Sequence, residues 1–379
     1  MPWKEVTKMT LLQEFIHLAM KPECNLTSLC KRYGISRKTA YKWIHRYETE
    51  GIKGLKEKSR RPKNSPTKTN IPMEQAIIDL RQKQPEWGGR KLRQVLINCS
   101  EQEVPAASTI NGILKRKGLI SAVQSEKHHR WQRFEAEEPN LLWQMDFKGH
   151  FPIDTGRCHP LTVLDDHSRF NLGLFACLDE RTETVQNHLT QLFTRFGLPD
   201  RILADNGSPW GCQGNDYYTK LSVWLLLLGI QLIHGRPLHP QTTGKDERFH
   251  RTLKAELLQH RWFKSIQDCQ EAFDQWRDVY NLERPHESLG MQTPVSHYKV
   301  SNRTFPKNLP AIEYNISDII RTVDQDGIIY FKGKHFKAGK AFRGQKVALR
   351  TTESEGIYNL IFYTEKIKTI DLNGYNELN

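Results

Sequence analysis

Three carboxylates could do chemistry together, and one of them, Asp146, occupies a position where the surrounding sequence does not favour a charged side chain. Asp146 lies inside the alternating segment "NLLWQMDFKGHF", Asp205 follows the apolar run "RILA", and Glu247 lies near the beginning of a helical segment that opens with Gly244. An aspartate within a strand is disfavoured by strand propensity and by loss of hydration. A bound cation or a cationic partner is the usual compensation.

Carboxylates from three separate elements can support phosphodiester chemistry. They can hold two Mg²⁺ ions about 3.5–4 Å apart, one activating the attacking oxygen and the other stabilising the leaving oxygen. Hard oxygen ligands suit Mg²⁺, with Mn²⁺ as a substitute, and not zinc. Arg251 and Lys254 follow Glu247 on the same predicted helix face, where they can contact DNA phosphates. We also expect Gln241 to contact DNA.

The elements that must position these carboxylates predict an α/β core over residues 135–300. Three successive antiparallel strands are expected from residue 140 to residue 178, with a turn around Asp154-Thr155-Gly156. A helix, a short strand over Arg201 to Ala204, a second helix and another strand follow. Catalytic side chains collect at the C-terminal ends of strands in alternating α/β sheets, which is where Asp205 is expected.

Other polar residues in this region have competing interpretations. The Asp165-Asp166 doublet could supply the first catalytic acid, but a turn at a strand end is the better fit. Asp246 should point about 100° away from Glu247 on a helix and is therefore expected to face solvent. Three histidines could suggest a metal, although core or DNA-contact roles are favoured. They are His234, His239 and His250.

The positive charge of the chain is concentrated near its N-terminus. The net charge is +13, and the excess falls within residues 1–136. Residues 1–52 predict a helix-turn-helix domain, with Gly34 ending one helix, Ser36 capping the next, and Ala40, Trp43, Ile44 and Tyr47 as its buried stripe. Four residues at the start of this second helix are expected to face the major groove. They are Arg37, Lys38, Tyr41 and Lys42. The alternative is a helical hairpin with a solvated basic face.

A basic linker and a second helical domain follow. Residues 53–70 are rich in Lys, Arg, Pro and Ser, and Arg60 and Arg61 could lie in a minor groove or simply be solvated. Residues 71–125 predict three short helices, either a second helix-turn-helix or winged-helix domain that binds DNA, or a domain used only for packing. Residues 315–373 predict a small antiparallel β-barrel or sandwich, whose lysines either contact DNA or form a solvated surface.

Several classes of protein are disfavoured by composition. The longest apolar run, "LSVWLLLLGI", reaches half of the ~20 residues that a membrane-spanning helix needs. The first residues lack the order of a signal peptide. The seven cysteines include no C-x-x-C pair, which argues against a disulfide framework and a zinc finger. A cytoplasmic protein is therefore expected.

Five segments in order resemble the integrase catalytic core shared by retroviral integrases and bacterial insertion-sequence transposases of the Asp-Asp-Glu type. They are "WQMDF", "VLDDHSRF", "LADNGSPW", "HPQTTGKDERFHRTLK" and "YNLERPHESLGMQTPVSHY". The N-terminal "LCKRYGISRKTAYKWIHRY" extends the resemblance to the transposases. The resemblance implies an RNase H-like core, a small SH3-like C-terminal domain, and a site in which Asp146 and Asp205 bridge the metals and Glu247 completes the set. The family usually has an apolar residue at position 246.

The function expected from these features is that of a DNA transposase. It would bind the terminal inverted repeats of its element, nick the 3′ ends and transfer them into target DNA, as at least a dimer, near the bacterial nucleoid. An RNase H-like nuclease would share the carboxylates without paired end recognition, and a DNA-binding regulator would lack them. The carboxylate set argues against the regulator, and the two helical domains argue against the plain nuclease.

Overall fold

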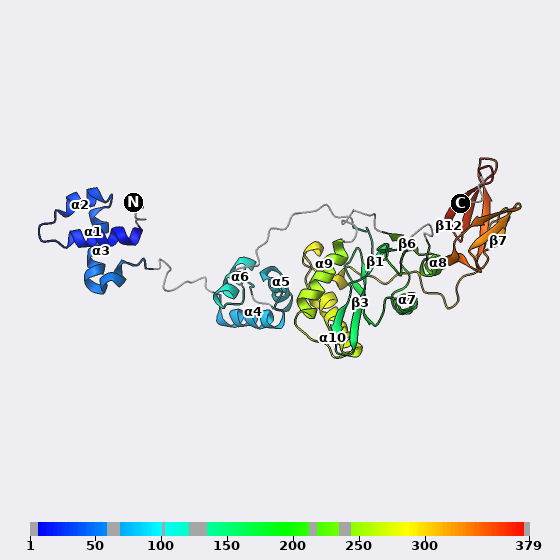
Figure 1. Ribbon diagram of the computed structural model, residues 1–379. Helices are drawn as coiled ribbons and strands as arrows, with labels where there is room; N and C mark the ends of the chain where they lie inside the picture. Colours follow the sequence, from blue (N-terminus) through cyan, green and yellow to red (C-terminus); the bar gives the residue numbers. More distant parts are fainter. Residues whose placement is uncertain are drawn as a thin grey trace. The chain divides into compact units, whose positions relative to one another are not determined.

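A computed structural model describes residues 7–58, 69–100, 103–120, 135–211, 218–234 and 244–374. The chain divides into two compact units, Met1–Lys68 and Thr69–Asn379, which we describe separately (Figure 1). Arg60, Arg61, His239 and Gln241 lie outside the described residues. In the described part of the chain, no helix is long and apolar enough to cross a membrane.

The first unit contains the predicted helix-turn-helix, preceded by one further helix. Its helices are α1 (Lys8–Ala19), α2 (Leu26–Arg32) and α3 (Arg37–Glu50), with a 3₁₀ turn at Gly51–Leu55. The Ser36 hydroxyl caps α3 by accepting a hydrogen bond from the Thr39 N–H at 3.2 Å, as predicted. Of the predicted stripe on α3, Ala40 and Trp43 are buried, while Ile44 and Tyr47 are partly buried.

The second unit begins with three helices around their own apolar core. They are α4 (Ile71–Lys83), α5 (Gly89–Cys99) and α6 (Ala107–Arg116). Met73, Ile77, Trp87, Leu92 and Ile110 are among the residues buried between them. Three helices with a shared core agree with the helical domain expected in this part of the chain.

A six-stranded sheet forms the centre of the α/β core. Its strands are β1 (Leu142–Phe147), β2 (Phe151–Ile153), β3 (Gly156–Asp165), β4 (Asn171–Cys177), β5 (Arg201–Ala204) and β6 (Gln231–His234). The order is β2-β3-β1-β5-β6, with β4 also paired to β3. Pairing is antiparallel among β1 to β4, so the region predicted as three antiparallel strands contains four, whereas β5 and β6 run parallel to β1.

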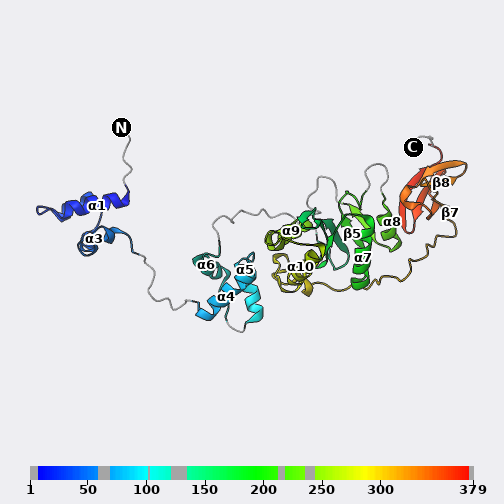
Figure 2. The ribbon, with the colours of Figure 1, turned by 60° about the horizontal axis from the view of Figure 1, so that its bottom comes forward.

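Helices cover both faces of this sheet (Figures 1 and 2). One face packs against α7 (Thr182–Phe196) and α8 (Lys220–Leu227), and the other packs against α9 (Gly244–Leu253) and α10 (Ile266–Asp278). Alternation along β3 produces both contacts, because Leu161 and Val163 point to one layer while Cys158 and Leu164 point to the other. Strands between two helical layers explain why every residue of β4 is buried.

The C-terminal domain consists of short antiparallel strands. They are β7 (Ile319–Thr322), β8 (Ile328–Phe331), β9 (Lys334–Lys337), β10 (Lys346–Thr351), β11 (Ile357–Phe362) and β12 (Glu365–Asp371). They form a four-stranded sheet, β12-β11-β10-β7, and a separate hairpin, β8-β9. Within the described residues the ladders do not close into the expected barrel. The domain's core includes Val223, Leu226 and Leu227 of α8, which explains why that helix is apolar on several sides.

Candidate active site

Asp146 is the penultimate residue of β1, next to the end of the strand. Its side chain is 33% exposed, and its backbone pairs with Thr162 of β3. Burial, followed by the negative charge of Asp205, raises the pKa of Asp146 to about 7, and the charges of Glu180 and Glu247 act in the same direction. Asp146 is therefore a partly buried carboxylate that the negative charges of other carboxylates disfavour.

Asp205 is the first residue after β5, the strand beside β1. The parallel register pairs Gln144 with Leu203, and continuing it by two residues sets Asp146 alongside Asp205. The Asp205 Oδ1 accepts a hydrogen bond from the Gly207 N–H at 2.9 Å. His234, at the end of β6, donates from Nδ1 to the Asp205 carbonyl oxygen at 2.7 Å. Two aspartates thus lie at the C-terminal ends of neighbouring parallel strands.

Glu247 lies in the first turn of α9 and is exposed. Its charge contributes to the raised pKa of Asp146, which places the two carboxylates within electrostatic reach of each other. Arg251, one turn later, and Lys254, which begins a π-helical turn (Lys254–Leu258), are also exposed. The predicted stripe of Glu247, Arg251 and Lys254 therefore faces away from the core.

The donor set of these carboxylates fits a hard divalent cation. The negative charges of Asp205 and Glu247 repel that of the partly buried Asp146, and a bound divalent cation would reduce this repulsion. Nevertheless, across residues 7–374 outside the undescribed gaps, no three His, Cys, Asp or Glu side chains already converge as a metal-binding group. In the structure, Asp146 and Asp205 lie together and Glu247 lies nearby, but the three carboxylates do not form a complete metal-binding site.

The expectation that Asp246 faces solvent is wrong, because the residue is only 3% exposed. The helix α9 packs its Asp246, Phe249 and Leu253 side against the protein, so the 100° offset turns Glu247, not Asp246, outward. Among the described residues, the buried Asp246 Oδ1 has no hydrogen-bond partner. Burial, and then the charge of Asp146, raises the pKa of Asp246 well above its usual value.

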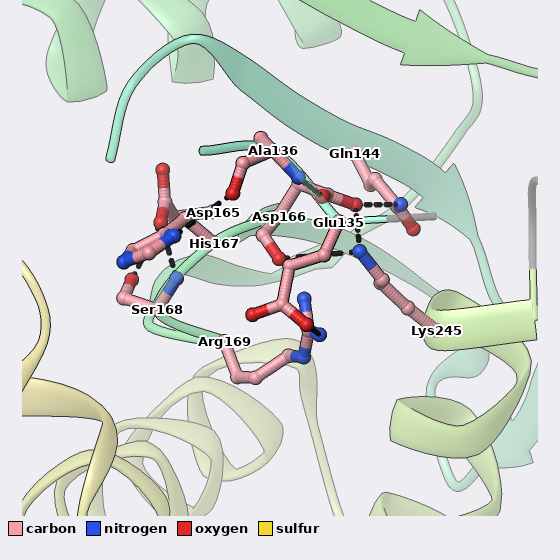
Figure 3. A network of polar contacts seen from close by, with 9 residues as sticks. All are labelled: Glu135, Ala136, Gln144, Asp165, Asp166, His167, Ser168, Arg169 and Lys245. Carbon is pink, nitrogen blue, oxygen red and sulfur yellow. Dashed lines mark hydrogen bonds and ion pairs between the residues drawn. The ribbon is translucent and has the colours of Figure 1, made fainter. Parts of the chain in front are cut away.

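The Asp165-Asp166 doublet ends β3 and forms the expected turn (Figure 3). The Asp165 carboxylate accepts hydrogen bonds from the Ser168 N–H at 2.8 Å, the Ser168 hydroxyl at 2.6 Å and the Asn140 N–H at 2.7 Å. A carboxylate with three internal donors is used to shape the turn.

Asp166 connects this turn to the helix that carries Glu247. Its fully buried carboxylate accepts hydrogen bonds from the Ala136 N–H at 2.7 Å, the Gln144 amide at 2.5 Å and the Lys245 ammonium at 2.5 Å (Figure 3). Lys245 is the second residue of α9, so this ion pair fixes the beginning of the helix two residues before Glu247. Sequence reasoning missed Lys245, because its partner is 79 residues away.

His250 lies on the buried side of α9 and contacts β1 and β3. Its Nε2 is 2.9 Å from the Thr162 hydroxyl oxygen, and its Nδ1 is 3.8 Å from the Asp146 Oδ2. Burial, aided by the charge of Lys148, lowers the pKa of His250 to about 4. His250 thus lies beside Asp146, while His234 contacts the backbone of Asp205.

The residues predicted to recognise DNA are accessible on the surface of the first unit. Arg37, Lys38, Tyr41 and Lys42 are all exposed at the start of α3, and the Lys42 ammonium lies 5.1 Å from the centre of the Trp43 ring. In the C-terminal domain, Lys332 and Lys334 instead bond within the protein, to the Tyr358 hydroxyl and the Leu372 carbonyl oxygen.

Comparisons with known proteins agree with this architecture. Residues 136–240 and 228–294 match two families described as integrase core domain, and residues 318–378 match the C-terminal domain of IS481 family transposases. Residues 39–114 match a homeodomain-like domain, and residues 13–63 match a helix-turn-helix domain.

Individual relatives are distant but span much of the chain. A transposase of transposon Tn552 from Staphylococcus aureus is 23% identical over 90% of this chain and 78% of its own. An uncharacterized protein of insertion element IS476 from Xanthomonas euvesicatoria is 24% identical over 75% and 81%. Among solved structures, the HTLV-2 integrase catalytic core in complex with magnesium is 17% identical, covering 43% of this chain and all of that one, with a TM-score of 0.34.

These matches agree on one kind of protein. An integrase core lies between helix-turn-helix domains that imply DNA binding and the C-terminal domain of a transposase. The chain is therefore a DNA transposase with an integrase core domain.

Proposed function

We propose that this transposase cuts and joins DNA ends with Asp146, Asp205 and Glu247 as ligands of Mg²⁺. The observation that carries the proposal is the alignment of Asp146 with Asp205 on neighbouring parallel strands, with the charge of Glu247 acting on Asp146. Bound cations would stabilise the negative charge that develops on the attacking and leaving oxygens. Mn²⁺ is expected to substitute for Mg²⁺, because both accept carboxylate oxygens.

The residues around the carboxylates would hold the DNA. Arg251 and Lys254 are exposed on the face of Glu247 and can contact phosphates beside the scissile bond. In strand transfer, the 3′ oxygen of the element end bonds to a target phosphorus, and the bond from that phosphorus to the target's own 3′ oxygen breaks. Holding both strands near this reaction geometry is the main contribution that positioned cationic side chains can make.

End recognition is assigned to the N-terminal domains. Arg37, Lys38, Tyr41 and Lys42 would read the terminal inverted repeats from α3, with contributions from the linker arginines, while Gln241 of the core region would also contact DNA. Joining two ends requires two copies of the chain, so we propose at least a dimer on DNA. A nuclease of the same fold would cut without this pairing, and a regulator would not cut.

The test uses the short inverted repeats that we expect on either side of the encoding gene. Short duplexes ending in each repeat are incubated with the full-length protein, a target plasmid and Mg²⁺. Nicking at the 3′ end of the repeat and joining to the plasmid are expected, and a duplex with a scrambled end should give neither. Cleavage that ignores the end sequence would indicate a nuclease, and binding without cleavage would indicate a regulator.

A further inference from the structure

We propose that His250 is a fourth ligand of the catalytic cation, bonded through Nδ1 beside Asp146 and held in place by Thr162. This inference rests on the proposed function, since it adds a nitrogen ligand to the same carboxylate site. Three contacts between α9, β1 and β3 carry it.

The hydroxyl of Thr162 determines which ring nitrogen of His250 carries a proton. The Thr162 Oγ1 is 2.9 Å from the Asp146 carbonyl oxygen, and a carbonyl can only accept, so the hydroxyl proton is used there. The contact of 2.9 Å between Thr162 Oγ1 and His250 Nε2 must then have the ring N–H as donor. Nδ1 is the nitrogen left to offer a lone pair. Metal-bound histidines commonly show this arrangement, in which the second ring nitrogen donates to a neighbouring oxygen.

The position of Nδ1 suits a shared cation better than a direct hydrogen bond. Nδ1 lies 3.8 Å from the Asp146 Oδ2, which is too long for a hydrogen bond. Two ligands of one cation, each bonded at about 2.1 Å, can lie up to about 4.2 Å apart. In an octahedral site, cis ligands at this bond length lie about 3.0 Å apart and trans ligands about 4.2 Å apart, so a shift of less than about 1 Å would let both atoms bind one ion.

A second polar residue on the same side of α9 supports this interpretation. Asp246 is one helical turn before His250, its buried Oδ1 has no partner in the part of the chain that the structure describes, and Asp146 is the residue whose charge acts on it most strongly. Buried polar atoms normally find partners. That the buried face of α9 turns both of these residues toward Asp146 indicates that a cation belongs between the helix and β1.

Substitutions can separate the two ring nitrogens. In His250→Asn the amide group lies where Nδ1 was and can supply an oxygen to the cation, while the Thr162 contact is lost. In His250→Gln the amide group lies nearer the place of Nε2 and can keep the Thr162 contact, while no atom replaces Nδ1. Thr162→Val keeps the shape of the strand residue but removes the hydroxyl that fixes the ring.

The experiment measures Mn²⁺ binding to the full-length protein without DNA, by electron spin-echo envelope modulation and by titration. We expect a directly bonded histidine nitrogen in the wild type, identified by ¹⁵N-histidine labelling, and its loss in both His250 variants. Mn²⁺ affinity should fall about 10–100-fold in His250→Gln and Thr162→Val, and less in His250→Asn.

The outcomes separate this inference from the proposed function. If Mn²⁺ binding depends on Asp205, two results would overturn the role of His250 alone. One is a wild-type spectrum without a histidine nitrogen, and the other is a histidine nitrogen that remains in His250→Gln. Mn²⁺ binding that is unchanged in Asp205→Asn would instead contradict the carboxylate site itself. If His250→Gln does not fold, the nitrogen signal in His250→Asn decides the question.

Discussion

Replacing Lys245 with methionine should loosen the helix that carries Glu247. The Asp166 side chain is fully buried and the Lys245 side chain is only 17% exposed, so solvent screens their ion pair little. Methionine retains the apolar stem and leaves the carboxylate with two donors among the described residues, the Ala136 N–H and the Gln144 amide. Removing one partner of a buried pair costs about 3–5 kcal/mol, because the other charge stays buried.

Amide hydrogen exchange over residues 244–253 measures this loss locally. A cost of about 3–5 kcal/mol corresponds to exchange that is roughly 10²- to 10⁴-fold faster, provided that α9 opens independently of the remaining core. Lys254→Met, at an exposed lysine in the π-helical turn that follows α9, is the matched control and should change exchange only slightly.

A second substitution tests the cause. Asp166→Asn in the Lys245→Met background removes the unpaired charge while keeping an acceptor for the Ala136 N–H, so much of the protection should return. Unchanged exchange in Lys245→Met, or a double variant that is less protected than the single one, would refute the assignment of this ion pair to holding α9.

Three further predictions concern DNA and cation binding. Alanine at three exposed residues of α3 should weaken binding to the element ends and flatten its salt dependence by a slope of roughly one per lost phosphate contact, seen in binding assays at several salt concentrations. They are Arg37, Lys38 and Lys42. Alanine at both Arg251 and Lys254 should lower strand transfer on the order of a hundredfold while end binding changes little; a parallel collapse of binding would assign them to end recognition. Because the pKa of Asp146 is raised to about 7, its proton competes with the cation below that pH, so Mn²⁺ affinity should rise as pH approaches 7 and level off above it; a flat profile from pH 5 to 8 would contradict this.

Local signals in the sequence were enough to predict the helix-turn-helix and the strands. The Ser36 cap and the apolar stripe of α3 depend on residues a few positions apart, which a sequence displays directly. The same holds for the turn at Asp165-Asp166, whose donors include Ser168 three residues later.

Features that depend on packing between distant segments could not be predicted in this way. Helical periodicity separates Asp246 from Glu247 by 100°, but only the packing of α9 determines which of them is buried, and the sequence-based choice for Asp246 was wrong. Likewise, the pairing of Lys245 with Asp166 depends on how α9 crosses the end of β3. The reason for the run of leucines in α8 could not be predicted either, because it is the packing of the C-terminal domain on that helix.

The most direct test of the carboxylate site is strand transfer by Asp205→Asn, measured together with end binding on the same protein preparation. Asp200→Asn is the matched control, since Asp200 precedes the other end of β5 and forms an exposed ion pair with Arg303 that is worth about 0–1 kcal/mol. We predict that Asp205→Asn binds element ends normally but gives no Mg²⁺-dependent nicking or joining, while Asp200→Asn retains both. Mg²⁺-dependent strand transfer by Asp205→Asn at the wild-type rate would contradict the account.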